Sequence, residues 1–178
     1  MDLHEAIEKR RTIRKFKNPA TEEQLQRIIL EGVKAPSASN RQPWEFVIVD
    51  NPDLIEKIAE IKYNSNLSRS LGEAASQAQK DSFANASLIL VYYNGGRDAN
   101  AGGSWACIEN MVLATVAEGL ASRIAGFFEP DFAEEVNKLV RAPKDMKLAA
   151  AISIGVAAEV PGPRKLRPTG SWLHRNTF

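Results

Sequence analysis

The sequence predicts one domain in which helices pack on a β-sheet, and three observations lead to this prediction. The chain has 178 residues and 44% hydrophobic residues, enough for one sizeable core and few for two domains. The continuous apolar run at residues 88–93 is typical of a strand that is covered on both faces, and residues 148–156 are predicted to form another buried strand. Capped amphipathic segments alternate with these runs, as in layered helix–sheet domains.

The first two helices are predicted from their caps. Residues 2–9 suit a short helix that begins after Asp2. Thr21 followed by Gln24 is a capping box, and it starts a helix with a clear apolar stripe. Pro36 terminates that helix and opens a loop of small residues.

The remaining elements follow from apolar periodicity and turn residues. We expect helices from residue 52, over residues 104–118 and from residue 130, and strands at residues 45–50, 88–93, 122–127 and 148–156. The glycine pairs at 95–96 and 102–103 are interpreted as turns. The polar segment 63–81 has the weakest pattern and is assigned no element.

Composition excludes several classes of protein. The net charge of +1 disfavours a general nucleic-acid binder, which needs a broad cationic face. Cys107 is the only cysteine and lies in an apolar helical pattern, so we expect a buried structural thiol. His4 and His174 lie at opposite ends without partners at ligand spacing, so no metal site is expected. Without a long apolar segment or a signal-like N-terminus, we expect a cytoplasmic protein that does not bind membranes.

Residues 10–14 place three guanidinium groups and a hydroxyl within five positions. In an extended chain Thr12 and Arg14 point to one side, with Ile13 on the other, and Arg10 can reach the side of Arg14. Guanidinium groups suit phosphate oxygens. The alternative is a solvated basic turn that pairs with Glu5 and Glu8, and the spacing alone favours neither interpretation.

The loop 36–44 carries hydrogen-bonding side chains between two prolines. Ser37 and Asn40 are predicted to contact a ligand, because serine and asparagine offer donors and acceptors to a polar edge or a hydroxyl chain. Trp44, in contrast, is expected to fill the core at the start of the next strand.

The C-terminal segment 157–178 is an arm without a regular amphipathic element. Leu166, Trp172, Leu173 and Phe178 make it too apolar for a free tail, so it packs either on its own body or on a second copy. Lys165 and Arg167 share one side of an extended chain. Taken alone they are an ordinary basic arm, but they gain weight beside the first arginine cluster.

No set of catalytic side chains stands out. The chain has no Ser/His/Asp set with a plausible base, no phosphate-binding glycine motif and no assignable acid–base pair of carboxylates. Ligand-binding residues without acid–base machinery indicate that a cofactor supplies the chemistry.

At these residues the chain resembles the nitroreductase family of flavin enzymes over nearly its whole length. Residues 10–14 (Arg-Arg-Thr-Ile-Arg) look like the family's Arg-Arg-Ser-x-Arg start, with Thr in place of Ser. Residues 36–44 look like its Pro-Ser-x-x-Asn-x-Gln-Pro-Trp loop, which is the more specific motif. The segments 109–114, 119–120 and 125–127, the strand ending at Gly155 and the arm at 165–167 resemble the family's central and closing parts.

This resemblance implies an α+β fold, in which a mixed sheet lies between helical layers of one domain (residues 1–178). It also implies an intertwined homodimer whose arm, residues 157–178, embraces the partner, with FMN at the interface. The site residues that it implies are Arg10, Arg11, Thr12, Arg14, Pro36, Ser37, Asn40, Ala125, Gly126, Lys165 and Arg167.

The resemblance also assigns roles to these residues. Arg10, Lys165 and Arg167 would hold the phosphate, and Arg14 would lie at the pyrimidine edge of the ring. Pro36, Ser37 and Asn40 would come from the other subunit. Ala125 and Gly126 would present backbone groups near the reactive flavin nitrogen. Which residue of 63–81 meets the flavin stays open among Asn64, Asn66, Gln77 and Gln79.

The chemistry implied is transfer of a hydride from NADH or NADPH to FMN, then of two electrons to a small acceptor such as a nitroaromatic or a quinone. A specialised family member is the first alternative: a dehalogenase, a dehydrogenase or a flavin-fragmenting enzyme. A flavin-binding protein without turnover is the second. The chain is short for the family and lacks an obvious extended lid, so substrate selection stays open.

Overall fold

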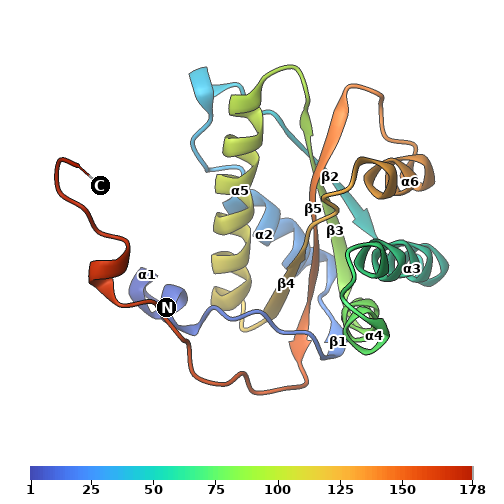
Figure 1. Ribbon diagram of the computed structural model, residues 1–178, viewed down its shortest axis with the longest axis horizontal. Coiled ribbons are helices and arrows are strands. Elements are labelled where there is room, and N and C mark those ends of the chain that lie inside the picture. Colours follow the sequence, from blue (N-terminus) through green and yellow to red (C-terminus); the bar gives the residue numbers. More distant parts are fainter. Residues whose placement is uncertain (178) are drawn as a thin grey trace.

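In the computed structural model, which describes residues 1–177, helices cover both faces of a five-stranded β-sheet (Figure 1). The helices are α1 (Leu3–Lys9), α2 (Glu22–Gly32), α3 (Pro52–Ser68), α4 (Glu73–Asp81), α5 (Asp98–Ala117) and α6 (Pro130–Val140). The strands are β1 (Phe16–Pro19), β2 (Trp44–Val49), β3 (Ser87–Asn94), β4 (Ala121–Ala125) and β5 (Met146–Ala157). Two 3-10 turns, Ala38–Asn40 and Thr169–Ser171, complete the assignment. The predicted three-layer α+β architecture is confirmed.

The sheet is organised around the long strand β5. The strand order is β1–β5–β3–β2, and β4 pairs with β5 as well. All four strand pairings are antiparallel, and one isolated bridge between Thr12 and Ser122 is parallel. The first six residues of β3 are buried, because helices cover this strand on both faces. The apolar run at 88–93 therefore lies in a strand that is covered on both faces, as predicted.

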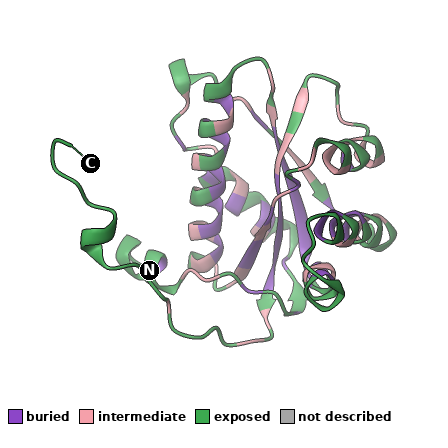
Figure 2. Cartoon of the chain, viewed as in Figure 1, coloured by how far each residue is buried: buried purple, intermediate pink, exposed green. Residues whose placement is uncertain are grey.

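Two apolar cores flank the sheet. Helices α2 and α5 pack on one face, and α1 packs against α5. Helices α3, α4 and α6 lie on the other face. Figure 2 shows buried residues in the sheet and on the helix faces turned toward it. Trp44, 6% exposed, belongs to the first core as predicted. Cys107 is fully buried there, as predicted, and burial raises the pKa of its thiol to about 12.

The caps form as their sequence predicts. Oδ1 of Asp2 accepts the N–H of Glu5 at the start of α1. The side chains of Thr21 and Gln24 each accept the other's backbone N–H, so the capping box of α2 is complete.

The expectations for residues 63–81 and for the second glycine pair need correction. Residues 63–81 contain the end of α3 and all of α4. Their buried faces are partly polar, so no apolar stripe marks them: the Ser76 hydroxyl donates to the Gly72 carbonyl, and the Ser65 hydroxyl donates to Glu129. Gly102 and Gly103 lie inside α5, not in a turn. A Cβ on Gly103 would lie 3.3 Å from the Cβ of Ser37, so this glycine allows a loop to approach the helix closely.

The first part of the arm stays on its own chain. The N–H of Ala158 donates to the Lys15 carbonyl at 2.8 Å. The N–H of Arg14 donates to Oε1 of Glu159 at 2.5 Å. Nη2 of Arg164 donates to the carbonyls of Ile7 and Arg10, both at 2.8 Å, at the C-terminal end of α1.

Beyond Arg164 the arm leaves the body of the molecule (Figure 1), and its large apolar side chains are exposed: Leu166, Trp172 and Leu173. Its transfer to a partner stays a prediction. Phe178, the last residue of the predicted arm, lies outside the described residues. Within residues 1–177, no helix combines the length and apolarity that crossing a membrane requires.

Candidate functional site

Residues 10–14 run beside β4. Thr12 forms a parallel bridge with Ser122, and the N–H of Ile13 donates to the Ser122 carbonyl at 3.0 Å. Ile13 is 4% exposed, whereas Thr12 and Arg14 are exposed. The predicted alternation is confirmed: an extended chain turns successive side chains to opposite sides. Arg14 therefore stands on the open side, next to the middle of β4.

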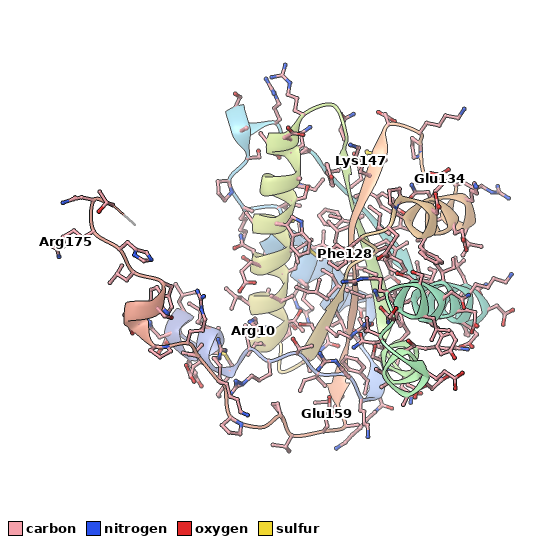
Figure 3. All side chains as sticks on the ribbon, in the orientation of Figure 1. Arg10, Phe128, Glu134, Lys147, Glu159 and Arg175 are labelled. Atoms are coloured by element: carbon pink, nitrogen blue, oxygen red, sulfur yellow. The ribbon has the colours of Figure 1, made fainter. Side chains whose placement is uncertain are left out.

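The two preceding arginines face different surroundings. Arg10 caps the C-terminal end of α1, and its Nε lies 4.0 Å from Oε1 of Glu109 on α5 (Figure 3). Arg11 lines a separate cavity of about 310 Å³, together with Ile13. Glu5 pairs with Lys9 at 2.6 Å, and within residues 1–177 neither Glu5 nor Glu8 forms an ion pair with these arginines.

Arg123 on β4 was not singled out by the sequence. Its side chain is 3% exposed, and its guanidinium carbon lies 5.2 Å from the centre of the Phe83 ring. Nη2 donates to Oε1 of Gln79, whereas Nη1 has no hydrogen-bond partner. Burial, and then the charge of Arg14, lower the pKa of Arg123 to about 10. β4 therefore holds a buried cation beside the exposed Arg14.

A second buried cation fixes the chain after β4. Nζ of Lys62 donates to the carbonyl of Gly126 at 2.7 Å and lies 5.4 Å from the centre of the Phe127 ring. The exposed Phe128 ring folds over Gly126, where an added Cβ would come within 2.5 Å of it (Figure 3). Ala125 is buried at the end of the strand. The hydrogen bond from Lys62 and the ring of Phe128 therefore hold the backbone at 125–126 in place.

Positive charge exceeds negative charge around this backbone. Burial, and then the charges of Arg123 and Arg69, lower the pKa of Lys62 to about 8. Glu129 acts in the opposite direction, but it already pairs with Arg69 at 3.2 Å. Among residues 1–177 no carboxylate reaches ion-pair distance of Arg123. Buried positive charge of this kind raises the potential at the nearby surface and favours an anionic or electron-rich ligand there.

The loop 36–44 has a strained backbone. Ser39, Asn40 and Gln42 have φ angles of 53°, 52° and 49°, in the left-handed region that L-residues rarely adopt. Oγ of Ser37 accepts the N–H of Gln42 at 2.9 Å and closes the loop. Pro36 and Asn40 are exposed. Left-handed residues at a loop tip are common at ligand sites, because surrounding structure must hold them there.

The loop and the arginines do not meet within one chain. Ser37 lies beside Gly103 near the start of α5, whereas Arg10 lies beside Glu109, six residues further along. That separation is about 9 Å along the helix axis. Lys165 and Arg167 are exposed, and the arm reaches Arg10 only through Arg164. The ligand contacts expected of all these residues stay predictions.

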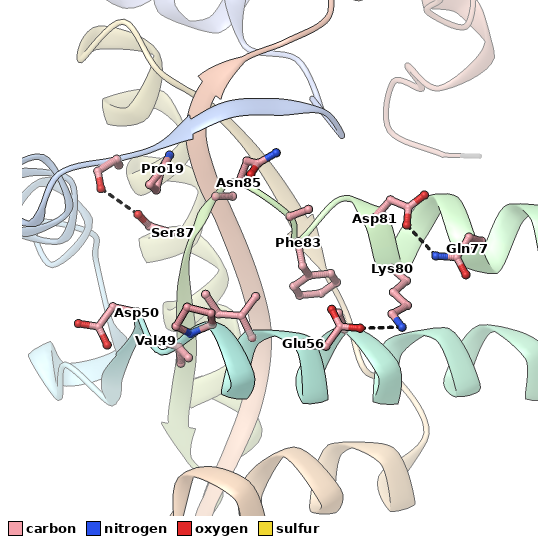
Figure 4. A pocket seen from close by; sticks show the side chains of 16 residues that line it. Pro19, Val49, Asp50, Glu56, Gln77, Lys80, Asp81, Phe83, Asn85 and Ser87 are labelled. Carbon is pink, nitrogen blue, oxygen red and sulfur yellow. Dashed lines mark hydrogen bonds and ion pairs between the residues drawn. The ribbon is translucent and has the colours of Figure 1, made fainter.

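A sizeable cavity lies elsewhere. It has a volume of about 670 Å³ and lies between α3, α4 and the start of β3 (Figure 4). Its polar side chains bond one another: Lys80 pairs with Glu56 at 2.8 Å, and Gln77 donates to Asp81 at 2.7 Å. None of the residues predicted for the site lines it. The candidate site is instead the open surface beside β4.

Comparison with known proteins decides the family. The model of the nitroreductase family matches residues 7–156. The chain belongs to the nitroreductase family. A protein of Methanothermobacter thermautotrophicus, provisionally named NADH dehydrogenase/NAD(P)H nitroreductase, is 28% identical and aligns over 93% of this chain and 83% of its own. The iodotyrosine deiodinase of Thermotoga neapolitana is also 28% identical, over 99% and 98%.

Solved structures of the family share the fold of this nitroreductase-family chain. A structure of oxidised iodotyrosine deiodinase bound to FMN and 3-iodo-L-tyrosine has a TM-score of 0.83 at 24% identity, over 99% of this chain and 100% of that one. A nitroreductase with bound FMN from Desulfitobacterium hafniense has a TM-score of 0.79 at 21% identity, over 98% and 97%.

The structure also separates the four candidates in residues 63–81 of this nitroreductase-family chain. Asn64 is exposed, Asn66 is buried with no partner for its Nδ2, and Gln77 bonds Asp81. Gln79 alone among them contacts a residue of β4, because it accepts from Arg123. Sequence reasoning missed Lys62 and Arg123. The signal was present: each is a charged residue on the buried face of its helix or strand.

Proposed function

We propose that this protein is an FMN-dependent oxidoreductase. It accepts a hydride from NADH or NADPH on FMN and passes two electrons to a small organic acceptor, such as a nitroaromatic or a quinone. The observation that carries the proposal is the excess of positive charge on the ledge formed by β4 and residues 10–14. Family membership and the FMN named in related structures support it.

The residues of the ledge fit the cofactor. FMN offers a phosphate and a polar ring edge that becomes negative on reduction. The exposed guanidinium of Arg14 is a donor suited to such an edge, and the buried charge of Arg123 adds to the positive potential beside it. Lys62 donates a hydrogen bond to the Gly126 carbonyl, so the backbone of 125–126 is fixed where a flat ring would lie. Within residues 1–177, no carboxylate forms an ion pair with Arg123 and neutralises its charge.

Each residue group then has a role. Arg10, Lys165 and Arg167 hold the phosphate, with Thr12 and Arg11 in the same segment. Arg14 binds the pyrimidine edge. Ala125 and Gly126 offer backbone groups beside the ring. The arm reaches the phosphate side because Arg164 fastens it to the carbonyl of Arg10 at 2.8 Å.

A homodimer completes the site. A second copy supplies Pro36, Ser37 and Asn40, which make no contact with the arginines of their own chain in residues 1–177. The exposed apolar side chains of the arm beyond Arg164 suit packing on that copy. We infer one FMN-binding domain per chain, 1–178, an arm exchanged from residue 157 onward, and a cytoplasmic location without nucleic-acid or membrane partners.

When bound, FMN supplies the hydride and electron chemistry. The side chains of the protein bind and orient it. Arg14 and its neighbours stabilise negative charge at the ring edge, and the ledge excludes water from one face of the ring. No side chain of the described site acts as a nucleophile or a general acid.

Reductive dehalogenation is the second candidate. The alignment with the Thermotoga neapolitana deiodinase extends over 98% of that protein, at 28% identity, and this extent supports the candidate. Release of iodide from 3-iodo-L-tyrosine by the reduced protein would favour this function over nitro or quinone reduction.

The direct test is cofactor loading. We expect purified protein to be yellow, or to take up FMN to one per chain, and to bleach on addition of NADH or NADPH in the absence of oxygen. A reoxidation panel of nitroaromatics, quinones and 3-iodo-L-tyrosine then identifies the acceptor class. Colourless protein that takes up no FMN refutes the proposal, and a yellow protein inert to both nucleotides favours a storage or sensing role.

A further inference from the structure

Two arginines line one cavity and have no ionic partner. The cavity has a volume of about 350 Å³ and lies where the loop 36–44, the end of β3 and the start of α5 meet. Arg41 and Arg97 line it, and both are exposed. Within residues 1–177 neither guanidinium forms an ion pair with a carboxylate. Two cations that line one cavity repel each other unless an anion lies between them.

The neutral groups around this cavity already bond one another. The N–H of Asn94 donates to the Pro43 carbonyl at 3.2 Å, which joins the end of β3 to the loop. Nδ2 of Asn100 donates to the Asn94 carbonyl at 2.9 Å, and Asn100 is 7% exposed. The N–H of Gly96 donates to Oδ1 of Asn94 at 3.0 Å. The cavity therefore has a well-connected neutral frame, whereas both its arginines still lack an anionic partner.

Positive charge exceeds negative charge around this frame. Lys147, at the start of β5, lies close by, because a Cβ on Gly95 would come within 2.8 Å of its Cε (Figure 3). Asp145 accepts from an amide of the frame at 3.0 Å, and Asp98 is the first residue of α5. In the described part of the chain, neither carboxylate forms an ion pair with the two arginines. Three cations and two carboxylates leave this surface positive, which favours an anionic ligand.

We propose that Arg41 and Arg97 bind a phosphate monoester, the group that NADPH carries on its adenosine ribose and that NADH lacks. This inference deepens the proposed function and rests on it, because it makes NADPH the preferred donor. A guanidinium group is a planar fork that matches phosphate oxygens. Arginine is also the side chain that accommodates the 2′-phosphate of this dinucleotide in other folds.

The position of Arg41 agrees with this role. It directly follows Asn40, which is predicted to border the flavin of the second copy. Asn40 and Gln42 have φ angles of 52° and 49°, and residues in this region persist only where the surrounding structure fixes them. The loop therefore fixes Arg41 beside the proposed flavin site, where a nucleotide that delivers a hydride must bind.

The test measures binding of adenosine 2′,5′-bisphosphate and of 5′-AMP by calorimetry, because these two nucleotides differ only in the 2′-phosphate. Wild type should bind the bisphosphate about a hundredfold more tightly, and Arg41→Gln or Arg97→Gln should each cut this ratio about tenfold. Arg141 is an exposed arginine at the end of α6, outside the cavity, so Arg141→Gln is the matched control and should leave the ratio unchanged.

Two further measurements complete the test. In the FMN-loaded protein, Arg41→Gln and Arg97→Gln should raise the KM for NADPH about tenfold and leave the KM for NADH unchanged. Inorganic phosphate should displace the bisphosphate, but with lower affinity. Both arginine side chains are exposed, so the variants should unfold at the temperature of wild type.

Three results would overturn the inference. The first is equal affinity of wild type for the two adenosine nucleotides. The second is a ratio that both arginine substitutions leave unchanged, which would make these arginines solvated surface residues. The third is inorganic phosphate that binds as tightly as the bisphosphate, which would make the cavity a site for free phosphate.

The two proposals fail separately, because calorimetry requires no turnover. Wild-type protein that takes up no FMN refutes the proposed function itself. Wild-type protein that takes up FMN and bleaches with NADH and NADPH alike, but binds the two adenosine nucleotides equally, refutes only the phosphate site at Arg41 and Arg97.

Discussion

Lys62 predicts an unusual dependence of stability on pH. Its side chain is 4% exposed, and its ammonium donates to the Gly126 carbonyl. Burial, then the charges of Arg123 and Arg69, lower its pKa from the ordinary 10.5 to about 8. Because the folded-state pKa lies below that of the unfolded chain, the unfolded chain binds more protons between about pH 8 and pH 10.5. The free energy of unfolding should therefore rise with pH across this window.

The linkage between proton binding and folding gives the expected size of this rise in the free energy of unfolding. A displacement of about 2.5 units corresponds to roughly 3 kcal/mol over the whole window. Most of this increase falls between about pH 7 and pH 9.5, so the free energy of unfolding of the FMN-free protein should rise by about 2 kcal/mol over that range. Most small proteins lose stability or stay level there, because their maximum lies between about pH 5 and 8.

The measurement is urea unfolding of FMN-free protein at fixed protein concentration, followed by tryptophan fluorescence. Lys62→Met should abolish the rise, since methionine does not titrate and fills similar space. Lys57→Met on the exposed face of the same helix is the matched control and should retain the rise. Equal pH profiles for wild type and Lys62→Met would show that Lys62 keeps its ordinary pKa, and the electrostatic description of the ledge would be wrong.

Three further substitutions test other parts of the structure. Gly155→Ala should lower stability by about 1–3 kcal/mol, measured by thermal unfolding, because the added Cβ would lie 2.5 Å from the carbonyl oxygen of Asn18 in the neighbouring strand. Arg164→Ala should reduce hydrogen-exchange protection of residues 3–9 about tenfold, because it removes the Nη2 donor that binds the carbonyls of Ile7 and Arg10 at the C-terminal end of α1. Arg10→Ala or Arg167→Ala should each weaken FMN binding by about 2 kcal/mol, roughly 30-fold, in a titration of FMN fluorescence.

Each of these has a matched control. Gly162→Ala lies on the arm with nothing within 4 Å of the added Cβ and should be neutral. Arg164→Lys keeps the charge but has a shorter reach to the two carbonyls and should be intermediate; equal protection in wild type and Arg164→Ala would contradict a capping role. Arg27→Ala removes a surface arginine paired with Glu118 and should leave FMN affinity unchanged. Full FMN retention in both Arg10→Ala and Arg167→Ala would refute the phosphate assignment.

The elements that sequence predicted correctly depend on near neighbours. The capping box at Thr21, the cap at Asp2 and the buried runs of β3 and β5 are set by residues within a few positions of one another. The alternation that exposes Arg14 and buries Ile13 has the same local origin. Helix α4 was missed because its buried Ser76 bonds its own helix, and a polar residue that is satisfied locally leaves no apolar signature.

The sequence by itself determined the layered fold and the resemblance to a flavin family, and it singled out the two motifs for which ligand binding is predicted, because short-range spacing and side-chain chemistry suffice for these. Only the tertiary structure decided that Lys62 and Arg123 are buried cations beside Arg14, and that the loop at Ser37 lies apart from the arginines along α5. Burial of a charge and the distance between two motifs depend on contacts between segments remote in the chain, and no local pattern records them.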